Sequence, residues 1–268
     1  MAMIPKPFIN SVVSIGIEGE KGTSWIGTGF LVGKKDPKSD GFYPYLVTNT
    51  HIVKGNNNIK VRFIDKNTNY LKEYTIKLVE NGETFFTSHY DSKIDISVIF
   101  LSADAFRHSI TQFGFFDIDA HSYTSSEFIE NGGDEGSSIF MLGYPMGLIS
   151  KLSNSPICRM GCIARFDKKE IEEEKCFIVD IQNFPGNSGS PILTKAECIS
   201  MSGTKAITKC VLLGIVNSYL PYQENLINSQ TGQVVEIRSE NSGLALANPV
   251  EYIKEVIATD LIKRGISI

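Results

Sequence analysis

Short apolar runs separated by turn-forming residues dominate this 268-residue chain, and helical periodicity is scarce. Strand-length runs with turn signals between them predict an all-β barrel or sandwich. Six such runs precede residue 102, which is enough for one small closed barrel. They cover residues 12–17, 24–32, 45–48, 59–63, 74–79 and 96–101.

A second series of about six runs fills the other half of the chain. These runs cover residues 137–142, 158–166, 176–181, 190–194, 210–217 and 244–247. We therefore expect an N-terminal barrel over residues 8–102 and a C-terminal barrel over residues 137–248. The less regular residues 103–136, which end in the turn-rich "ENGGDEG", are the predicted linker.

Three further segments have a distinctive composition. The spacing of apolar residues after Pro249 suits an amphipathic helix, and predicts a closing helix over residues 249–264. The charged stretch "DKKEIEEEK", residues 167–175, predicts the tip of a hairpin. Residues 224–240 are polar and predict a long insertion before the last strand.

Composition excludes several classes of protein. The net charge of −4 does not indicate a nucleic-acid partner. No apolar span is long enough for a transmembrane helix, and the first residues lack a signal-peptide pattern, so we expect a cytoplasmic protein without a membrane partner. The five cysteines are odd in number and fit no zinc spacing, which predicts free, buried thiols in a reducing compartment and neither metal nor cofactor.

The stretch "PGNSGSPI", residues 185–192, places Ser188 between two glycines after an apolar run. It is either a surface turn or a loop that holds a nucleophile. A serine needs a base to remove its proton, and an oxyanion hole needs two converging backbone N–H groups. Because Gly186 tolerates unusual backbone angles, the segment Gly186, Asn187 and Ser188 is the predicted oxyanion hole, with the N–H groups of Gly186 and Ser188 as donors.

A general base for Ser188 has to come from four histidines. His51 has the best context, because it follows the apolar strand "YLVTNT" directly and lies on a turn at a strand end. His89 lies in a polar loop, and His108 and His121 lie in the irregular stretch before the linker's end. We expect these three to be surface or hydrogen-bonded histidines.

The carboxylate that orients the histidine should lie beside a buried strand. Asp95 opens "DISVIFL", the most apolar strand of the first half. A charge at that place is costly unless it is paired, which favours Asp95 as the partner of His51. Asp91 is the alternative candidate, in a more polar sequence.

With the chain order His51, Asp95, Ser188, the sequence resembles the chymotrypsin-type (trypsin-like) serine peptidases, and most closely the bacterial trypsin-like domains of the HtrA/Deg proteases. The stretches that carry this resemblance follow the family's order along nearly the whole chain. They are "GTGFLVG" with "LVTNTHIV", "DISVIFL", "GYPMGL", "PGNSGSPI", "LLGIVNS" and "GLALANP".

The resemblance implies two perpendicular six-stranded antiparallel barrels with the active site in the cleft between them. It also implies a Ser-His-Asp triad, in which Ser188 attacks the scissile carbonyl, His51 transfers the proton and Asp95 fixes the imidazole tautomer. The edge of Asn217, Ser218 and Tyr219 would pair with the substrate backbone.

Two departures from the family pattern concern the nucleophile loop. Ser190 stands where the family usually has glycine, which adds a small side chain beneath the turn. Asn187 stands where the digestive enzymes have an aspartate that receives a newly cut N-terminal amine. An amide carries no charge to pair with that amine, and the chain lacks an "IVGG" start, so we expect no zymogen cleavage.

The residues before Ser188 predict its substrate preference. Gln182, Asn183 and Phe184 are expected to wall the primary specificity pocket, and Gln182 holds about the place of trypsin's carboxylate. Without a charge there, cleavage is expected after uncharged residues. Asp180 would restore a preference for basic residues if it faced the pocket.

We therefore expect a serine endopeptidase that acts on protein or peptide substrates and has no PDZ domain. A regulatory protein partner or a loop is expected to control it. A catalytically silent binding module with the same fold is the alternative. An esterase or acyl transferase is disfavoured because "GNSGSP" lacks the strand–turn–helix setting of an α/β-hydrolase.

Overall fold

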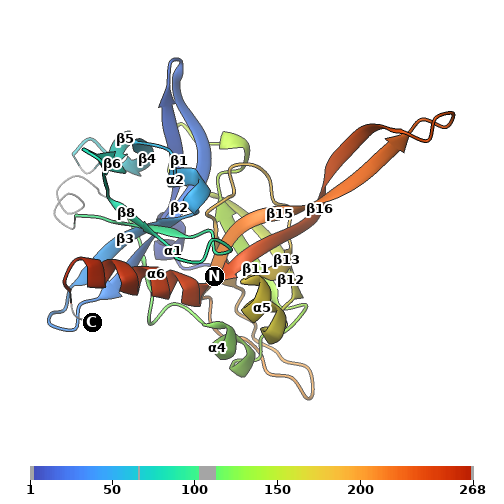
Figure 1. Ribbon diagram of the computed structural model, residues 1–268. Coiled ribbons are helices and arrows are strands. Elements are labelled where there is room, and N and C mark those ends of the chain that lie inside the picture. The colour runs from blue at the N-terminus through green and yellow to red at the C-terminus, as the bar shows by residue number, and fades with distance from the viewer. Residues whose placement is uncertain (1–2, 66, 103–112, 267–268) are drawn as a thin grey trace.

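A computed structural model describes residues 3–65, 67–102 and 113–266. It consists of two β-units and a C-terminal helix, α6 (Val250–Lys263), which contacts strands of both units (Figure 1). The fold-class prediction, an all-β double barrel of the chymotrypsin type with a closing helix, is confirmed. Residues 103–112 of the predicted linker lie outside the described residues.

The first β-unit is one sheet of eight strands within the described ranges. The strands follow the order β5-β4-β1-β2-β3-β9-β8, and β10 pairs in parallel with β2. Their bounds are β1 (Val12–Gly19), β2 (Gly22–Lys35), β3 (Phe42–Thr48), β4 (Asn58–Ile64), β5 (Leu71–Lys77), β8 (Phe86–Ser88), β9 (Ser97–Phe100) and β10 (Phe116–Asp117). Six of them correspond to the six predicted runs, and the short β8 and β10 are additional.

The second β-unit is a closed barrel of six strands, in the order β11-β12-β13-β16-β15-β14. The strands are β11 (Ser138–Gly143), β12 (Ile157–Arg165), β13 (Phe177–Asp180), β14 (Pro191–Thr194), β15 (Leu212–Ile227) and β16 (Val234–Pro249). All six predicted runs of this half are strands. Neighbouring strands in the barrel are antiparallel, as expected.

Strands of the first sheet are buried on both faces, which explains their unbroken apolar runs. In β2, Phe30 and Val32 face one core, whereas Leu31 between them faces another. Alternation of side chains along a strand produces this division. The core with Phe30 also contains Leu142 of β11 and Val256 of α6, so the two units and the closing helix share one apolar interface.

A buried carboxylate fixes helix α6 on the first sheet. Asp260 is only 3% exposed. Its oxygens accept hydrogen bonds from the hydroxyls of Tyr45 at 3.0 Å and Thr87 at 2.8 Å. Arg264, one helical turn further, donates to it at 2.6 Å. A buried charge is stable only when it is paired and hydrogen-bonded in this way.

Shorter elements connect the strands. They are α1 (Lys6–Asn10), α2 (Thr50–Val53), β6 (Val79–Glu80) with β7 (Glu83–Thr84), α4 (Ser125–Glu130), η1 (Pro145–Gly147) and α5 (Lys168–Glu174). Residues 167–175 connect the antiparallel strands β12 and β13, as the predicted hairpin tip requires, but they form helix α5 and not a simple turn. Asp167 caps this helix, because its side chain accepts hydrogen bonds from the N–H groups of Lys169 and Glu170. The high charge of the segment did not indicate this N-cap.

Two other predictions change in detail. The polar insertion at residues 224–240 is ordered, and forms the outer parts of β15 and β16 with the turn between them. The five cysteines are free, as predicted, but none is fully buried. Cys158 and Cys198 are exposed and the other three are partly buried, so the expectation of buried thiols is wrong.

Candidate active site

The ends of two neighbouring strands bring His51 and Asp95 together. β3 pairs with β9 through Thr48 and Ser97; His51 follows β3 in helix α2, and Asp95 precedes β9. Nδ1 of His51 lies 2.5 Å from Oδ2 of Asp95, and the backbone N–H of His51 donates to Oδ1 at 3.0 Å. The carboxylate therefore holds the imidazole and the backbone of His51 at once.

The side-chain amide of Asn49 helps to fix Asp95, since its Nδ2 donates to the backbone carbonyl of Asp95 at 2.7 Å. The side chain of Asp95 is 19% exposed, and that of His51 is 52% exposed. Partial burial strengthens the interaction of the carboxylate with the imidazole, while the exposed ring leaves Nε2 accessible.

The other candidates lie in different environments. His89 is buried, with Nε2 3.0 Å from a Glu255 oxygen and Nδ1 accepting the Asp91 N–H at 3.0 Å. Nδ1 of His121 accepts the N–H of Asp117 at 3.1 Å. These two are hydrogen-bonded histidines, and His108 lies outside the described residues. The Asp91 carboxylate accepts the N–H of Lys93 at 2.9 Å and, in the described part of the chain, forms no hydrogen bond with His51.

Ser188 lies on a loop with two left-handed glycines. Gly186 has a φ of +96° and Gly189 a φ of +86°, which L side chains rarely adopt. The N–H of Asn187 donates to the carbonyl of Phe184 at 3.0 Å, so this amide is not free to bind an oxyanion. Within residues 3–65, 67–102 and 113–266, the N–H groups of Gly186 and Ser188 have no acceptor, and these two remain the candidate donors.

Thr28 of the first unit fixes this loop of the second unit. Its N–H donates to the carbonyl of Ser188 at 2.9 Å, and its hydroxyl donates to the carbonyl of Gly186 at 2.7 Å. The same hydroxyl accepts the N–H of Tyr144 at 3.0 Å, and Thr48 donates to the Thr28 carbonyl at 2.8 Å. Sequence reasoning missed Thr28; the signal was a threonine between two glycines in a buried strand.

The hydroxyl of Ser190, the departure from the family pattern, is fully buried beneath the turn. It lies against Gly143 at the end of β11, where an added Cβ would overlap the Ser190 hydroxyl and approach Oδ1 of Asn187 to 2.7 Å. The extra hydroxyl therefore fits because residue 143 has no side chain. Asn187 is 1% exposed, so this polar cluster lies directly under the loop of Ser188.

A cavity of about 300 Å³ joins these parts. Its lining residues are His51, Asn183, Phe184, Pro185, Ser188, Asn217, Ser218 and Tyr219. Two predicted catalytic residues and five of the six predicted substrate-binding residues thus share one cavity, and Asp95 is held directly behind His51. Among the described residues, Ser188 Oγ and His51 Nε2 form no hydrogen bond. In free enzymes the distance between two such catalytic atoms is often long and shortens only when substrate binds.

Gln182 is the predicted pocket residue that the structure places elsewhere. Ile181 is buried and faces the barrel core, so the alternating chain turns Gln182 outward and Asn183 inward. The exposed Gln182 amide lies beside Gly243, whereas Asn183 is 3% exposed and lines the cavity. Asp180 is exposed and does not line the cavity. Of the three predicted wall residues before Ser188, the cavity therefore includes Asn183 and Phe184 but not Gln182.

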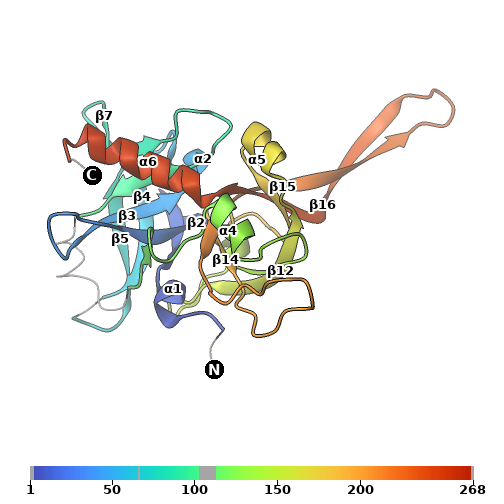
Figure 2. The same cartoon turned by 90° about the horizontal axis from the view of Figure 1, so that it is seen from below.

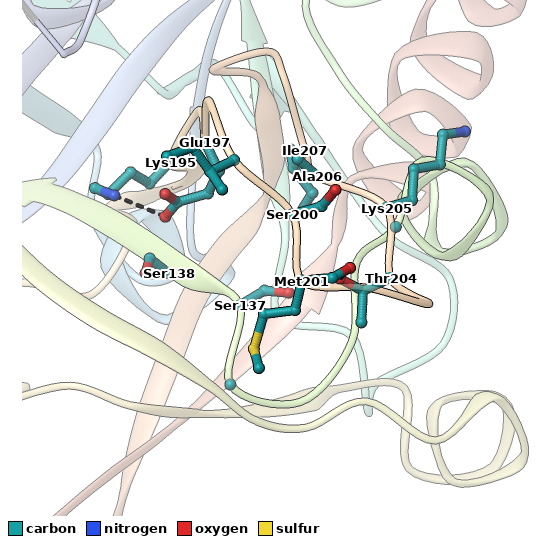
Figure 3. A pocket seen from close by; sticks show the side chains of 13 residues that line it. Ser137, Ser138, Lys195, Glu197, Ser200, Met201, Thr204, Lys205, Ala206 and Ile207 are labelled. Carbon is teal, nitrogen blue, oxygen red and sulfur yellow. Dashed lines mark hydrogen bonds and ion pairs between the residues drawn. The ribbon is translucent and has the colours of Figure 1, made fainter.

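A second hollow, of about 210 Å³, lies between the loop after β14 and the start of β11 (Figure 3). An ion pair between Lys195 and Glu197, at 2.7 Å, occupies its wall. It contains none of the predicted site residues.

Neither a metal-binding cluster nor a membrane-spanning helix occurs in the described ranges. No group of three histidine, cysteine, aspartate or glutamate side chains is placed to hold a metal ion there. Among these residues, no helix is long and apolar enough to cross a membrane.

Comparisons with known proteins address the family. The profile of the trypsin-like peptidase domain matches residues 27–199, well over half of the chain. Among solved structures, the chain is similar to the MamO protease domain from Magnetospirillum magneticum in its apo form, with 13% identity, a TM-score of 0.45, and coverage of 93% of this chain and 96% of that one. A search of curated proteins finds no match. The family match shows that this chain belongs to the trypsin-like peptidase domains.

Proposed function

We propose that this protein is a serine endopeptidase that cleaves protein or peptide substrates through an acyl-enzyme. One observation carries the proposal: the hydrogen-bonded pair of His51 and Asp95 opens onto the same cavity as Ser188. Ser188 Oγ attacks the scissile carbonyl, and His51 Nε2 takes its proton and later gives it to the leaving amine. Asp95 keeps the proton of the neutral imidazole on Nδ1 and stabilises the imidazolium.

The charge that develops on the substrate carbonyl oxygen would be stabilised by the N–H groups of Gly186 and Ser188. The hydrogen bonds from Thr28 hold the carbonyls of these two residues, and this fixes the conformation of the loop before substrate binds. Such preorganised donors commonly contribute 10²–10³-fold in kcat each.

The cavity supports a preference for uncharged residues before the cleaved bond. Its wall of Asn183, Phe184 and Tyr219 carries no carboxylate that would pair with a lysine or arginine. We expect small to medium side chains to fit best. A peptide library profile dominated by lysine or arginine would contradict this.

The proposal also concerns control of the enzyme. Asn187 is buried and carries no charge that would pair with an ammonium group, and Thr28 holds the loop through hydrogen bonds to the carbonyls of Gly186 and Ser188. We therefore expect no zymogen cleavage, and control by a protein partner or by a loop, in keeping with the resemblance to HtrA/Deg proteases. If trimming of an N-terminal segment proved necessary for activity, this part would be wrong.

The test uses a fluorophosphonate probe, which reacts with an activated serine. Labelling of the wild type and its loss in Ser188→Ala are expected. New N-termini should appear when the wild type, but not Ser188→Ala, is incubated with a cell lysate. No labelling under any condition would contradict the proposal and favour a silent binding module. Labelling without any new N-termini would contradict the peptidase and favour an acyl transferase or esterase.

A further inference from the structure

The outer parts of β15 and β16 form a two-stranded arm, residues 220–242, that projects far from both β-units (Figures 1 and 2). The pairing continues from the barrel to the tip, with Pro221 opposite Asn241 and Ile227 opposite Val234. Its register shifts at three places, between residues 216 and 218, 219 and 221, and 226 and 227. Isolated two-stranded hairpins are marginally stable in water. An arm of this length therefore calls for an explanation.

Beyond the barrel, one edge of β15 has no neighbouring strand among residues 3–65, 67–102 and 113–266. β15 pairs with β14 only from Leu212 to Ile215, whereas its pairing with β16 continues to Ile227. From Asn217 outward, in the described part of the chain, the edge that faces away from β16 carries no strand. A strand edge of this kind offers unpaired N–H and C=O groups to another chain.

This free edge begins at the candidate active site. Asn217, Ser218 and Tyr219 line the cavity that contains Ser188 and His51. At about 3.3 Å per residue, the edge continues from Tyr219 to Ile227 for about 26 Å. One continuous strand, β15, therefore lines the cavity and then forms one side of the arm.

The arm exposes apolar side chains and carries negative charge. Tyr222, Ile227, Val235 and Ile237 are each more than half exposed. The arm has three glutamates and one arginine, which lies 3.3 Å from one of the glutamates in an ion pair. Such a surface favours an extended segment with apolar and basic side chains.

We propose that the free edge of β15 beyond Tyr219 binds, as an added antiparallel strand, the part of an extended polypeptide substrate that lies N-terminal to the cleaved bond. This inference rests on the proposed function. β15 runs outward from the cavity, so an antiparallel partner runs inward and its C-terminal end reaches Ser188. The arm is thus an extension of the substrate-binding edge and selects substrates that are unfolded for many residues upstream.

A series of peptides with one shared cleavage site tests this directly. Extension from three to nine upstream residues of apolar and basic character should raise kcat/KM by about tenfold or more, since two net hydrogen bonds suffice for that factor. An equal extension downstream should change it by less than about twofold. Equal gains on both sides, or none upstream, would overturn the inference.

Backbone pairing is tested by N-methylation of the upstream residues. In a strand, alternate N–H groups face the same neighbour, so methylation at one parity should remove most of the gain and methylation at the other parity should leave it. Equal effects at both parities would show that side chains, and not the strand edge, provide the gain.

A shortened arm supplies the protein-side control. Replacing residues 222–240 by a two-residue Asn-Gly turn leaves Tyr219 in place and should reduce the ratio of kcat/KM for long and short peptides to below about twofold. Retention of the full ratio would overturn the inference. So would an arm-dependent dimer in analytical ultracentrifugation that binds no peptide, because the edge would then serve a second copy of the chain.

The two proposals fail separately. If neither long nor short peptides are cleaved and the fluorophosphonate probe does not label Ser188, the proposed function fails. If short peptides are cleaved and the probe labels Ser188, but upstream length has no effect, the function stands and the role of the arm is refuted.

Discussion

Replacing Asp95 by asparagine tests the central contact of the candidate site, and the structure dictates how the amide must lie. The wild-type carboxylate receives the backbone N–H of His51 at Oδ1 and faces Nδ1 with Oδ2. A backbone N–H can only donate, so the amide oxygen of the variant must take the Oδ1 place. Its NH₂ group then faces Nδ1 and must donate to it.

This arrangement inverts the tautomer of His51. Nδ1 becomes an acceptor, the ring proton moves to Nε2, and Nε2 can no longer take the proton of Ser188. We expect kcat to fall by about 10⁴-fold, the loss found when an orienting aspartate of a triad becomes asparagine. At 1.36 kcal/mol per factor of ten, this corresponds to about 5.4 kcal/mol of transition-state stabilisation.

The assay measures kcat on a peptide that the wild type cleaves, together with the rate of fluorophosphonate labelling. Asp91→Asn is the matched control, because Asp91 precedes the same strand and its carboxylate accepts the N–H of Lys93. It should retain kcat within about threefold. The reasoning fails if Asp95→Asn keeps more than a tenth of the wild-type kcat while both variants unfold at the wild-type temperature, or if Asp91→Asn loses as much as Asp95→Asn.

Three further predictions concern other parts of the molecule. Gly143→Ala should lower kcat by about 10²-fold, because the added Cβ would displace the loop of Ser188. Gly19→Ala is the kinetic control, because the Cβ added there would meet nothing nearer than 3.5 Å. Backbone N–H donors in its own turn lower the pKa of Asp65 to about 2. The carboxylate of Asp65 therefore stabilises the fold above its unfolded pKa near 4, and this contribution is lost as the pH falls through about 2. The urea midpoint should consequently decline less between pH 4 and pH 2 in Asp65→Asn than in the wild type. Burial raises the pKa of the Cys210 thiol to about 11, so iodoacetamide at pH 8 should alkylate the exposed Cys198 before Cys210. Mass spectrometry of the alkylated peptides measures both rates, and equal rates would contradict this.

The sequence predicted most of the fold because strand burial leaves a local signal. Runs such as "FLV" and "YLV" are apolar at every position since their strands contribute to cores on both faces. The short β8 and β10 left no such signal, because two or three residues cannot show a period. Helix α5 was missed since six of its seven residues are charged and only one side chain, Ile171, is buried.

The candidate site was predictable where chemistry demands a particular residue type. A histidine after one apolar strand and an aspartate before another become neighbours when those strands pair, as β3 and β9 do. The contacts of Thr28 were not predictable, because they join residues about 160 positions apart, as in the hydrogen bond from Thr28 to Gly186. Which of Gln182 and Asn183 faces the cavity depended on where β13 ends, a boundary that sequence patterns define poorly.

The position of the two β-units relative to one another determines whether the candidate active site is assembled. His51 and Asp95 belong to the first unit, and Ser188 to the second. The hydrogen bonds to the carbonyls of Gly186 and Ser188 come from Thr28, which is again in the first unit. The same interface contains the core shared with helix α6. Neither unit by itself could therefore orient the nucleophile, and activity should appear only once the shared core has closed.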